Sequence, residues 1–195
     1  MPIEHTNRKG DVYYLHAGRT PTRRPKYYCS RERGDAPLDT VPDGFEIWES
    51  PEGGLVYVRK AQPVVIPAFE REMVEDGIRR YAHLEYFLVD VQGDGLVIYL
   101  PSVDVDGLTR VMENFLPASA SFVRKERNKM VRRSPFVKMM RFVLEDEDKR
   151  LFRVERWCFR GSIEDWWPLH DVGSLGKLVQ KYAKHLGENS FFDLL

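Results

Sequence analysis

Three short groups of residues in this sequence have side chains that could perform acid–base or metal chemistry. They are Glu147-Asp-Lys149, Asp104-Val-Asp106-Gly107 and His170-Asp171. Carboxylates beside a lysine can hold a metal ion and activate water, and a histidine beside an aspartate can transfer protons. Each group has to be weighed against the element in which its residues lie.

None of these groups is well placed for catalysis. Glu147 to Lys149 falls in a predicted exposed hairpin turn, whereas a metal site needs carboxylates fixed on a strand. Asp104 to Gly107 is too short for a calcium loop and fits the start of a helix. His170 and Asp171 are adjacent in the chain, where side chains rarely face each other, and no Ser or Cys nucleophile can be assigned to them. We therefore favour a non-enzymatic protein, assign no catalytic residue and expect no metal site and no cofactor. An enzyme with a carboxylate or His170-centred site stays open as the last-ranked alternative, because no motif converges.

The distribution of charge is more informative than its total. The 30 basic and 30 acidic residues cancel. Residues 1–34, however, contain eight Lys or Arg against three Asp or Glu, a balance of +5. Residues 121–133 contain six against one, again +5, so the rest of the chain carries −10. Two separate basic segments of this kind are typical of proteins that bind polyanions.

The first basic segment combines cations with tyrosines. Cations between residues 19 and 26 can neutralise phosphates, while flanking tyrosines stack on bases or sugars. A basic hairpin of this kind can also enter a major groove. The residues predicted to bind nucleic acid, from both segments, are Arg19, Arg23, Arg24, Lys26, Tyr14, Tyr28, Arg124, Lys125, Arg132 and Arg133.

Less specific interpretations of the basic segments remain open. The tyrosines fit equally well in a solvated hairpin that packs against the next hairpin. The second segment also fits a soluble connector, or a patch that pairs with the acidic residues between 35 and 52.

The stretch from Leu151 to Leu169 contains three of the four tryptophans and should lie at the core. A strand running to Gly161, followed by Ser162 with Asp165 in a capping-box pattern, predicts that a helix starts there. Trp166 and Trp167 would then form a corner that either docks a partner or places at least one ring in the core.

Hydrophobic periodicity and turn residues predict the elements. Hairpins are expected at 11–15 with 26–30, 45–50 with 55–60, 84–90 with 96–100, and 136–145 with 150–159. Helices are expected at 68–82, at 105–116 with Asp104 as its cap, and at 174–186, with Gly187 as the stop. Residues 118–134 look irregular. This pattern predicts an α+β fold of antiparallel β-hairpins with helices packed on one face. We expect a basic β-hairpin module at residues 1–60 and an α+β domain at 61–195.

Cysteine usage and hydropathy suggest a location. Cys29 and Cys158 lie in separate segments without zinc-site spacing, although a disulfide between them remains open. The polar N-terminus and the lack of an 18-residue apolar run predict a cytoplasmic protein that does not enter membranes.

Several short stretches resemble a set of bacterial hypothetical proteins. They include Tyr13-Tyr14-Leu15-His16, Lys26-Tyr27-Tyr28-Cys29-Ser30, residues 41–47, His185-Leu186-Gly187 and Ser190-Phe191-Phe192. The resemblance spans nearly the whole chain and implies one co-linear architecture in a bacterial cytosol. It implies no activity and no catalytic residue.

The leading functional hypothesis is a non-enzymatic module that binds DNA, RNA or an acidic partner through its two basic segments. The alternative is a protein–protein interaction subunit that docks a larger partner through the tryptophan corner or an open β-edge. Salt sensitivity separates the two, because phosphate binding weakens steeply as salt rises.

Overall fold

The computed structural model describes residues 1–115, 119–160 and 163–194. The fold is α+β, as the sequence predicts, and the chain divides into two compact units. Unit 1 contains Met1–Gln62 and Ser102–Pro135, and unit 2 contains Pro63–Pro101 and Phe136–Leu195. The first boundary lies close to the predicted one after residue 60, but residues 102–135 group with unit 1 instead of the expected second domain.

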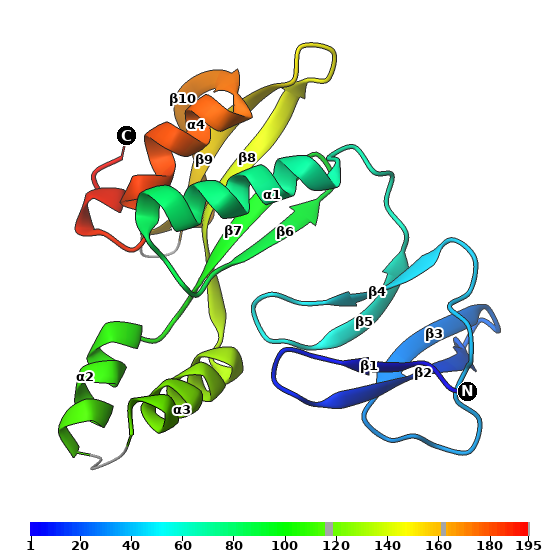
Figure 1. The fold of residues 1–195 in the computed structure, drawn as a ribbon. Helices are drawn as coiled ribbons and strands as arrows, with labels where there is room; N and C mark the ends of the chain where they lie inside the picture. The colour runs from blue at the N-terminus through cyan, green and yellow to red at the C-terminus, as the bar shows by residue number, and fades with distance from the viewer. Residues whose placement is uncertain (116–118, 161–162, 195) are drawn as a thin grey trace. The chain divides into compact units, whose positions relative to one another are not determined.

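Unit 2 is built on a five-stranded antiparallel sheet with the order β10-β9-β8-β7-β6 (Figure 1). Its strands are β6 (Leu88–Gln92), β7 (Gly95–Pro101), β8 (Phe136–Asp146), β9 (Leu151–Arg160) and β10 (Ile163–Ser174). The predicted hairpins β6–β7 and β8–β9 are both present. Successive side chains of a strand point to opposite faces, and Leu96, Ile98 and Leu100 of β7 lie on the face that contributes to the core, although β7 is buried at every position from Gly95 to Leu100.

Two helices cover that face, α1 (Ala68–Gly77) and α4 (Leu175–Tyr182), as Figure 1 shows. The core between helices and sheet includes Val74, Phe142, Phe152 and Val179, each at most 2% exposed. The prediction of helices on one face is therefore confirmed. The predicted helix 68–82 ends as a π-helical turn at Ile78–Ala82, and the predicted helix 174–186 ends in a 3₁₀ turn before Gly187, whose φ is +82°.

The predicted helix after Gly161 is wrong. Residues Ile163–Ser174 form the strand β10, which pairs with β9; Ser162 itself lies outside the described residues. The Asp165 carboxylate accepts a hydrogen bond from the neighbouring Trp166 N–H at 2.7 Å and caps no helix. Aromatic side chains pack well on a pleated surface, and cross-strand pairing with β9 outweighs the local capping pattern.

A hydrogen-bonded cluster joins β10 to α4. The Lys181 ammonium and the Tyr182 hydroxyl both donate to Asp171 Oδ2, the latter at 2.7 Å. These bonds lower the pKa of Asp171 below its ordinary value of 3.8. A carboxylate with a lowered pKa in the folded state adds stability above its ordinary pKa, and that stability is lost as pH falls through the folded pKa.

We expect Asp171→Asn to lower the free energy of unfolding at pH 7 by at most about 1 kcal/mol, because solvent screens this partly exposed cluster. The difference from wild type should shrink as pH falls below about 4, where wild-type Asp171 begins to lose its charge. Urea unfolding at neutral and at acidic pH measures both effects. If the variant and wild type differed in free energy of unfolding as much at acidic pH as at neutral pH, the lowered pKa of Asp171 would be contradicted.

Unit 1 contains two small antiparallel sheets. The first has the order β1-β2-β3, with β1 (Glu4–Thr6), β2 (Val12–Arg19) and β3 (Pro25–Ser30). The second pairs β4 (Phe45–Glu49) with β5 (Val56–Lys60). The β2–β3 and β4–β5 hairpins were predicted, whereas β1 was not, and Tyr27 of β3 packs edge-on against Phe45 of β4 with ring centroids 4.9 Å apart.

The rest of unit 1 is a pair of helices, α2 (Val105–Phe115) and α3 (Ala120–Arg133). Asp104 caps α2 as predicted, accepting from Gly107 N–H at 2.8 Å. The prediction that residues 118–134 are irregular is wrong for the described part, because α3 occupies it. Ser119 caps α3 by accepting from Phe122 N–H, and neither Gly nor Pro interrupts residues 119–134.

Candidate nucleic-acid interface

The second basic segment forms one exposed face of α3. Val123 and Val131 are buried on another side of the helix. Residues three or four positions apart lie next to each other on a helix, so side chains at such spacings form a continuous stripe along its surface. An open depression of about 440 Å³ follows the stripe, and its lining residues are Ser121, Arg124, Lys125, Asn128, Lys129 and Arg132. We call these six residues the basic face of α3.

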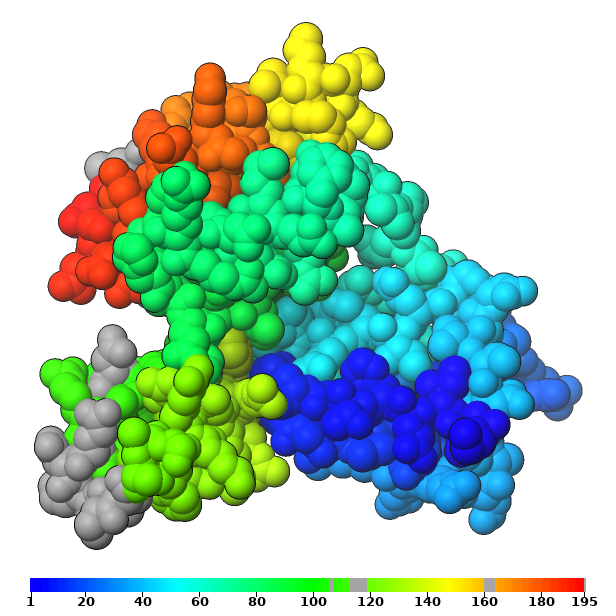
Figure 2. Space-filling view, in the orientation of Figure 1, coloured from blue at the N-terminus to red at the C-terminus, as the bar shows by residue number. Residues whose placement is uncertain are grey.

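Arg132 also lines a second depression, of about 330 Å³, whose other walls are Thr6 to Gly10. These residues lead from β1 into the β1–β2 turn, which spans Asn7 to Asp11. The two depressions therefore share a residue, and the basic face of α3 continues to the turn that carries Lys9. In the space-filling view α3, coloured yellow-green, is open to solvent along its length (Figure 2).

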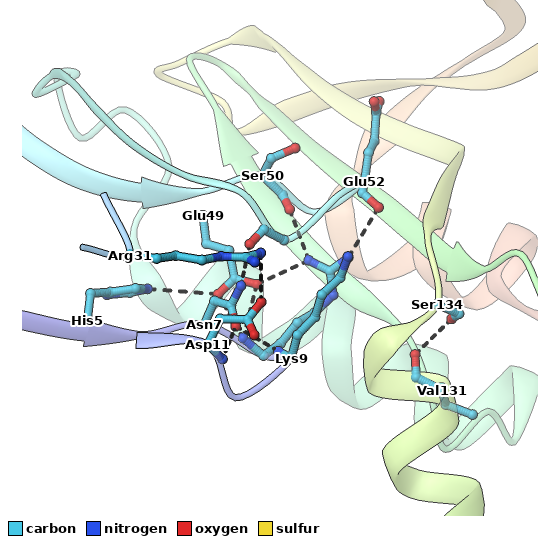
Figure 3. A network of polar contacts seen from close by, with 12 residues as sticks. His5, Asn7, Lys9, Asp11, Arg31, Glu49, Ser50, Glu52, Val131 and Ser134 are labelled. Atoms are coloured by element: carbon cyan, nitrogen blue, oxygen red, sulfur yellow. Dashed lines mark hydrogen bonds and ion pairs between the residues drawn. The ribbon is translucent and has the colours of Figure 1, made fainter. Parts of the chain in front are cut away.

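Asn7 fixes the shape of the β1–β2 turn (Figure 3). Its side-chain oxygen accepts from Lys9 N–H at 3.0 Å and from Asp11 N–H at 2.8 Å. Its amide nitrogen donates to the Gly54 carbonyl at 2.6 Å. Asn7 is buried, so these bonds hold the turn rigidly against the β4–β5 connection.

Arg8 anchors the same turn and contributes little free charge to the surface. Its guanidinium donates to Glu49 at 3.1 Å, to the Ser50 carbonyl at 3.0 Å and to the Glu52 carbonyl at 3.1 Å. Gly54 lies against it with φ +67°, and a Cβ there would be 2.8 Å from the guanidinium. Within the acidic segment 35–52, Glu49 therefore forms an ion pair with Arg8, and Glu46 forms one with Arg59.

The first basic segment lies at the tip of the β2–β3 hairpin. Thr20 N–H donates to the Arg24 carbonyl at 2.9 Å, which closes a tight turn with Arg23 in the left-handed region at φ +61°. The predicted side chains Arg19, Arg23, Arg24 and Lys26 are all exposed. The tip is therefore a solvated, positively charged loop.

The predicted stacking tyrosines share one face of this hairpin. The register pairs Tyr14 with Ser30, His16 with Tyr28 and Gly18 with Lys26. Tyr28 is 42% exposed and stacks on His16 with ring centroids 5.3 Å apart. The Lys26 ammonium lies 5.9 Å from the Tyr28 ring. Tyr14 is half-buried, so Tyr28 is the more accessible ring.

The other two tyrosines of this hairpin, Tyr13 and Tyr27, make contacts within the protein. Tyr13 is 5% exposed, and Tyr27 packs on Phe45. For Tyr27 the hairpin-packing interpretation is correct, while Tyr13 accepts a hydrogen bond from the Arg31 guanidinium at 3.3 Å.

The two basic segments form separate surfaces within unit 1. Arg132 lies beside the β1–β2 turn at one end of β2, while the hairpin tip lies at the other end. The eight residues of β2 separate these ends by about 25 Å. A ligand that contacts both must span that distance.

The tryptophan pair lies on the sheet of unit 2. Trp166 is half-buried and meets Trp157 of β9 edge-on at 4.9 Å. The Arg141 guanidinium lies 4.5 Å from the Trp166 ring, and Arg141 also pairs with Glu155. Trp167 is 47% exposed. The expectation that one of the two predicted rings lies in the core is wrong, because β10 is an edge strand and neither ring reaches the helix-covered core.

The candidate catalytic groups do not converge. Asp171 is bound by Lys181 and Tyr182, while His170 is exposed. Glu147 lies in the exposed β8–β9 turn, where Lys149 instead binds Asp146.

Among the described residues, no group of three or more His, Cys, Asp or Glu side chains could hold a metal ion. Cys29 and Cys158 are free thiols, and burial raises the pKa of Cys29. Within the described part of the chain, no helix has the length and apolar character needed to cross a membrane.

All four predicted cations of the second segment, Arg124, Lys125, Arg132 and Arg133, lie on α3. Asn128 and Lys129 belong to the same predicted basic segment without having been named as site residues, and Lys9 was not predicted to take part. Lys125, Lys129 and Arg132 are spaced as residues on one face of a helix, and residues 119–134 contain neither Gly nor Pro. Together these two features predict a helix with a basic face. No local pattern links Lys9 to Arg132, because they are brought together only by tertiary structure.

The comparisons with family models, curated proteins and solved structures gave no match.

Proposed function

We propose that this protein is a non-enzymatic module that binds nucleic acid or another acidic partner. The basic face of α3 and the β1–β2 turn form the main contact, and the β2–β3 hairpin tip forms a second one. The observation that carries the proposal is that Arg132 lines both depressions, so that one positively charged surface continues from α3 to Lys9.

Helix stability alone does not account for the charge on α3. Arg132 and Arg133 lie in the last turn, where cations interact favourably with the helix dipole, and Lys129 pairs with Glu126. Lys125 lies in the first half of the helix, where a cation gains nothing from the dipole. The exposed charge of Lys125 is one that a phosphate backbone would neutralise.

Phosphate binding makes a quantitative prediction about salt. A surface that neutralises about four phosphates loses affinity with a log–log slope near −3.6 on duplex DNA. Fluorescence anisotropy with labelled DNA and RNA oligonucleotides across a salt series measures this slope. The triple variant Lys125→Ala/Lys129→Ala/Arg132→Ala should lower affinity at least about tenfold and reduce the slope by about 2 to 3.

Two variants serve as controls. Lys177→Ala/Lys184→Ala removes exposed charges from unit 2 and should leave binding unchanged. Arg19→Ala/Arg24→Ala removes two tip cations and should weaken only ligands long enough to span about 25 Å. If wild type binds no polyanion at low salt, or if the triple variant binds as wild type does, the proposal fails.

The alternative function is a protein-interaction subunit that docks through unit 2. The observation that favours it is the exposure of two aromatic side chains near the sheet edge, Trp167 at 47% and Phe159 at 61%. Docking by strand addition is disfavoured, because Pro168 and the irregularity between Pro168 and Val172 interrupt the edge strand. An apolar interface of this kind would persist at high salt and be lost in Trp167→Ala, which a pull-down at high salt would reveal.

A further inference from the structure

The dimensions of α3 match one class of nucleic acid, and this inference rests on the function proposed above. A 14-residue helix is about 21 Å long and about 10–12 Å wide with its side chains. The major groove of B-form DNA is about 12 Å wide and admits one helix. The major groove of A-form RNA is too narrow for side chains to reach the bases.

The basic face of α3 contains polar, uncharged side chains between its cations. Ser121 and Asn128 both line the depression and lie seven residues apart, two helical turns, or about 10.5 Å. That separation corresponds to about three base-pair steps of 3.4 Å. Lysine and arginine contact phosphates and guanine edges, while Asn and Ser can both donate to and accept from base edges, and Asn suits the N6 and N7 positions of adenine.

The second depression supplies a flanking contact. Thr6 and Lys9 lie beside Arg132, which belongs to the last turn of α3. A strand of phosphates leaving the groove at that end of the helix would meet the Lys9 ammonium and the Thr6 hydroxyl. Neutral donors and cations at the border of a groove fix the register of a protein on a duplex.

Single strands fit this face poorly. Proteins that bind single-stranded nucleic acid without strong sequence preference use aromatic rings on which the bases stack. The residues that line the α3 depression include no aromatic and no apolar side chain. The exposed apolar side chains of α3, Phe122 and Met130 at 47% each, lie outside that lining. The basic face itself therefore offers neither a ring on which bases could stack nor an apolar side chain to insert into lipid.

We propose that the ligand is double-stranded B-form DNA, with the basic face of α3 in the major groove, Asn128 contacting a base edge, and Lys9 and Arg132 on flanking phosphates. Lys125 and Lys129 then reach the phosphates that border the groove.

The first test compares four ligands at one salt concentration by fluorescence anisotropy. They are a DNA duplex of about 20 base pairs, the RNA duplex of the same sequence, the single DNA strand, and vesicles containing phosphatidylserine. We expect the DNA duplex to bind at least about tenfold more tightly than the other three. Methylation of guanine N7, which lies in the major groove, should interfere with binding.

The second test addresses base contact. Wild type and Asn128→Ala are each used to select from a pool of random DNA duplexes, with Asn189→Ala, on an exposed turn of unit 2, as the matched control. Wild type and the control should enrich adenine at a fixed position, and Asn128→Ala should lose that preference while its salt slope stays the same. Loss of the Asn128 contact should cost about fivefold to a hundredfold on the selected sequence.

The outcomes separate this inference from the function on which it rests. Equal or tighter binding of single strands or of the RNA duplex, or a wild-type selection without base preference, overturns the duplex inference while nucleic-acid binding stands. Binding to vesicles alone, or to none of the four ligands, overturns both the duplex inference and nucleic-acid binding.

Discussion

Gly77→Ala is expected to lower the free energy of unfolding by about 2–3 kcal/mol. A Cβ at position 77 would lie 2.0 Å from Cγ1 of Val179, where ordinary carbon–carbon contacts are about 3.5–4 Å. Gly77 ends α1 and Val179 lies in α4, so the glycine sets how closely the two helices approach. Val179 is only 2% exposed and, being β-branched on a helix, has one strongly preferred rotamer. The clash must therefore push the helices apart.

The same helix pair provides a matched control. At Gly176, on α4, a Cβ would lie 3.5 Å from the sulfur of Met73, an ordinary contact. Gly176→Ala should be neutral or stabilise by up to about 1 kcal/mol, because alanine favours the helix. Urea unfolding monitored by circular dichroism measures both variants. Equal stability of Gly77→Ala and wild type would show that the close approach of α1 and α4 is absent.

Arg150→Gln is expected to destabilise the protein by about 3 kcal/mol. Arg150 lies at the end of the β8–β9 turn and donates to both carboxylate oxygens of Glu70 on α1, one of them at 2.9 Å. Glu70 is only 3% exposed. Removing the guanidinium leaves a buried carboxylate without its counter-charge, which costs more than the pair itself contributes.

A double variant distinguishes this cause from a general loss of packing. Glu70→Gln/Arg150→Gln removes both charges and should be more stable than Arg150→Gln alone. Glu72→Gln, an exposed position on α1, should change the free energy of unfolding by less than about 0.5 kcal/mol. Urea unfolding of the set gives the coupling energy. If the double variant is no more stable than Arg150→Gln, the buried pair is not the cause.

The elements that can be predicted from the sequence are those in which the apolar pattern and the turn residues indicate the same secondary structure. The β4–β5 and β6–β7 hairpins combine strand-like segments with glycine-containing turns, which fix where each hairpin reverses. In β10 a helix-start pattern competes with strand pairing, and only the tertiary contact with β9 decides between them. In α3 only Val123 and Val131 are buried. Many of the other positions hold cations, so the sequence shows little of the apolar periodicity that would predict a helix.

The candidate site shows the same limit. Each cation on α3 is visible in the sequence, and so is the basic character of the hairpin tip. Their arrangement is not visible, because it depends on contacts between distant segments. Arg132 meets a turn more than a hundred residues earlier in the chain, while the tip, closer in sequence to that turn, lies a full strand away.

The position of α2 and α3 between β7 and β8 has a consequence for how the protein folds. Pro101 pairs with Phe136, so two neighbouring strands must find each other across the whole of the intervening segment. Closing a flexible loop of that length costs about 2–3 kcal/mol more than closing a two-residue turn. The Ser102 N–H donates to the Pro135 carbonyl at 2.9 Å, at the base of the helical pair. If α2 and α3 pair early through local contacts, they bring β7 and β8 together and remove most of that entropic cost. The β7–β8 pair of unit 2 can then form as fast as a hairpin with a short turn.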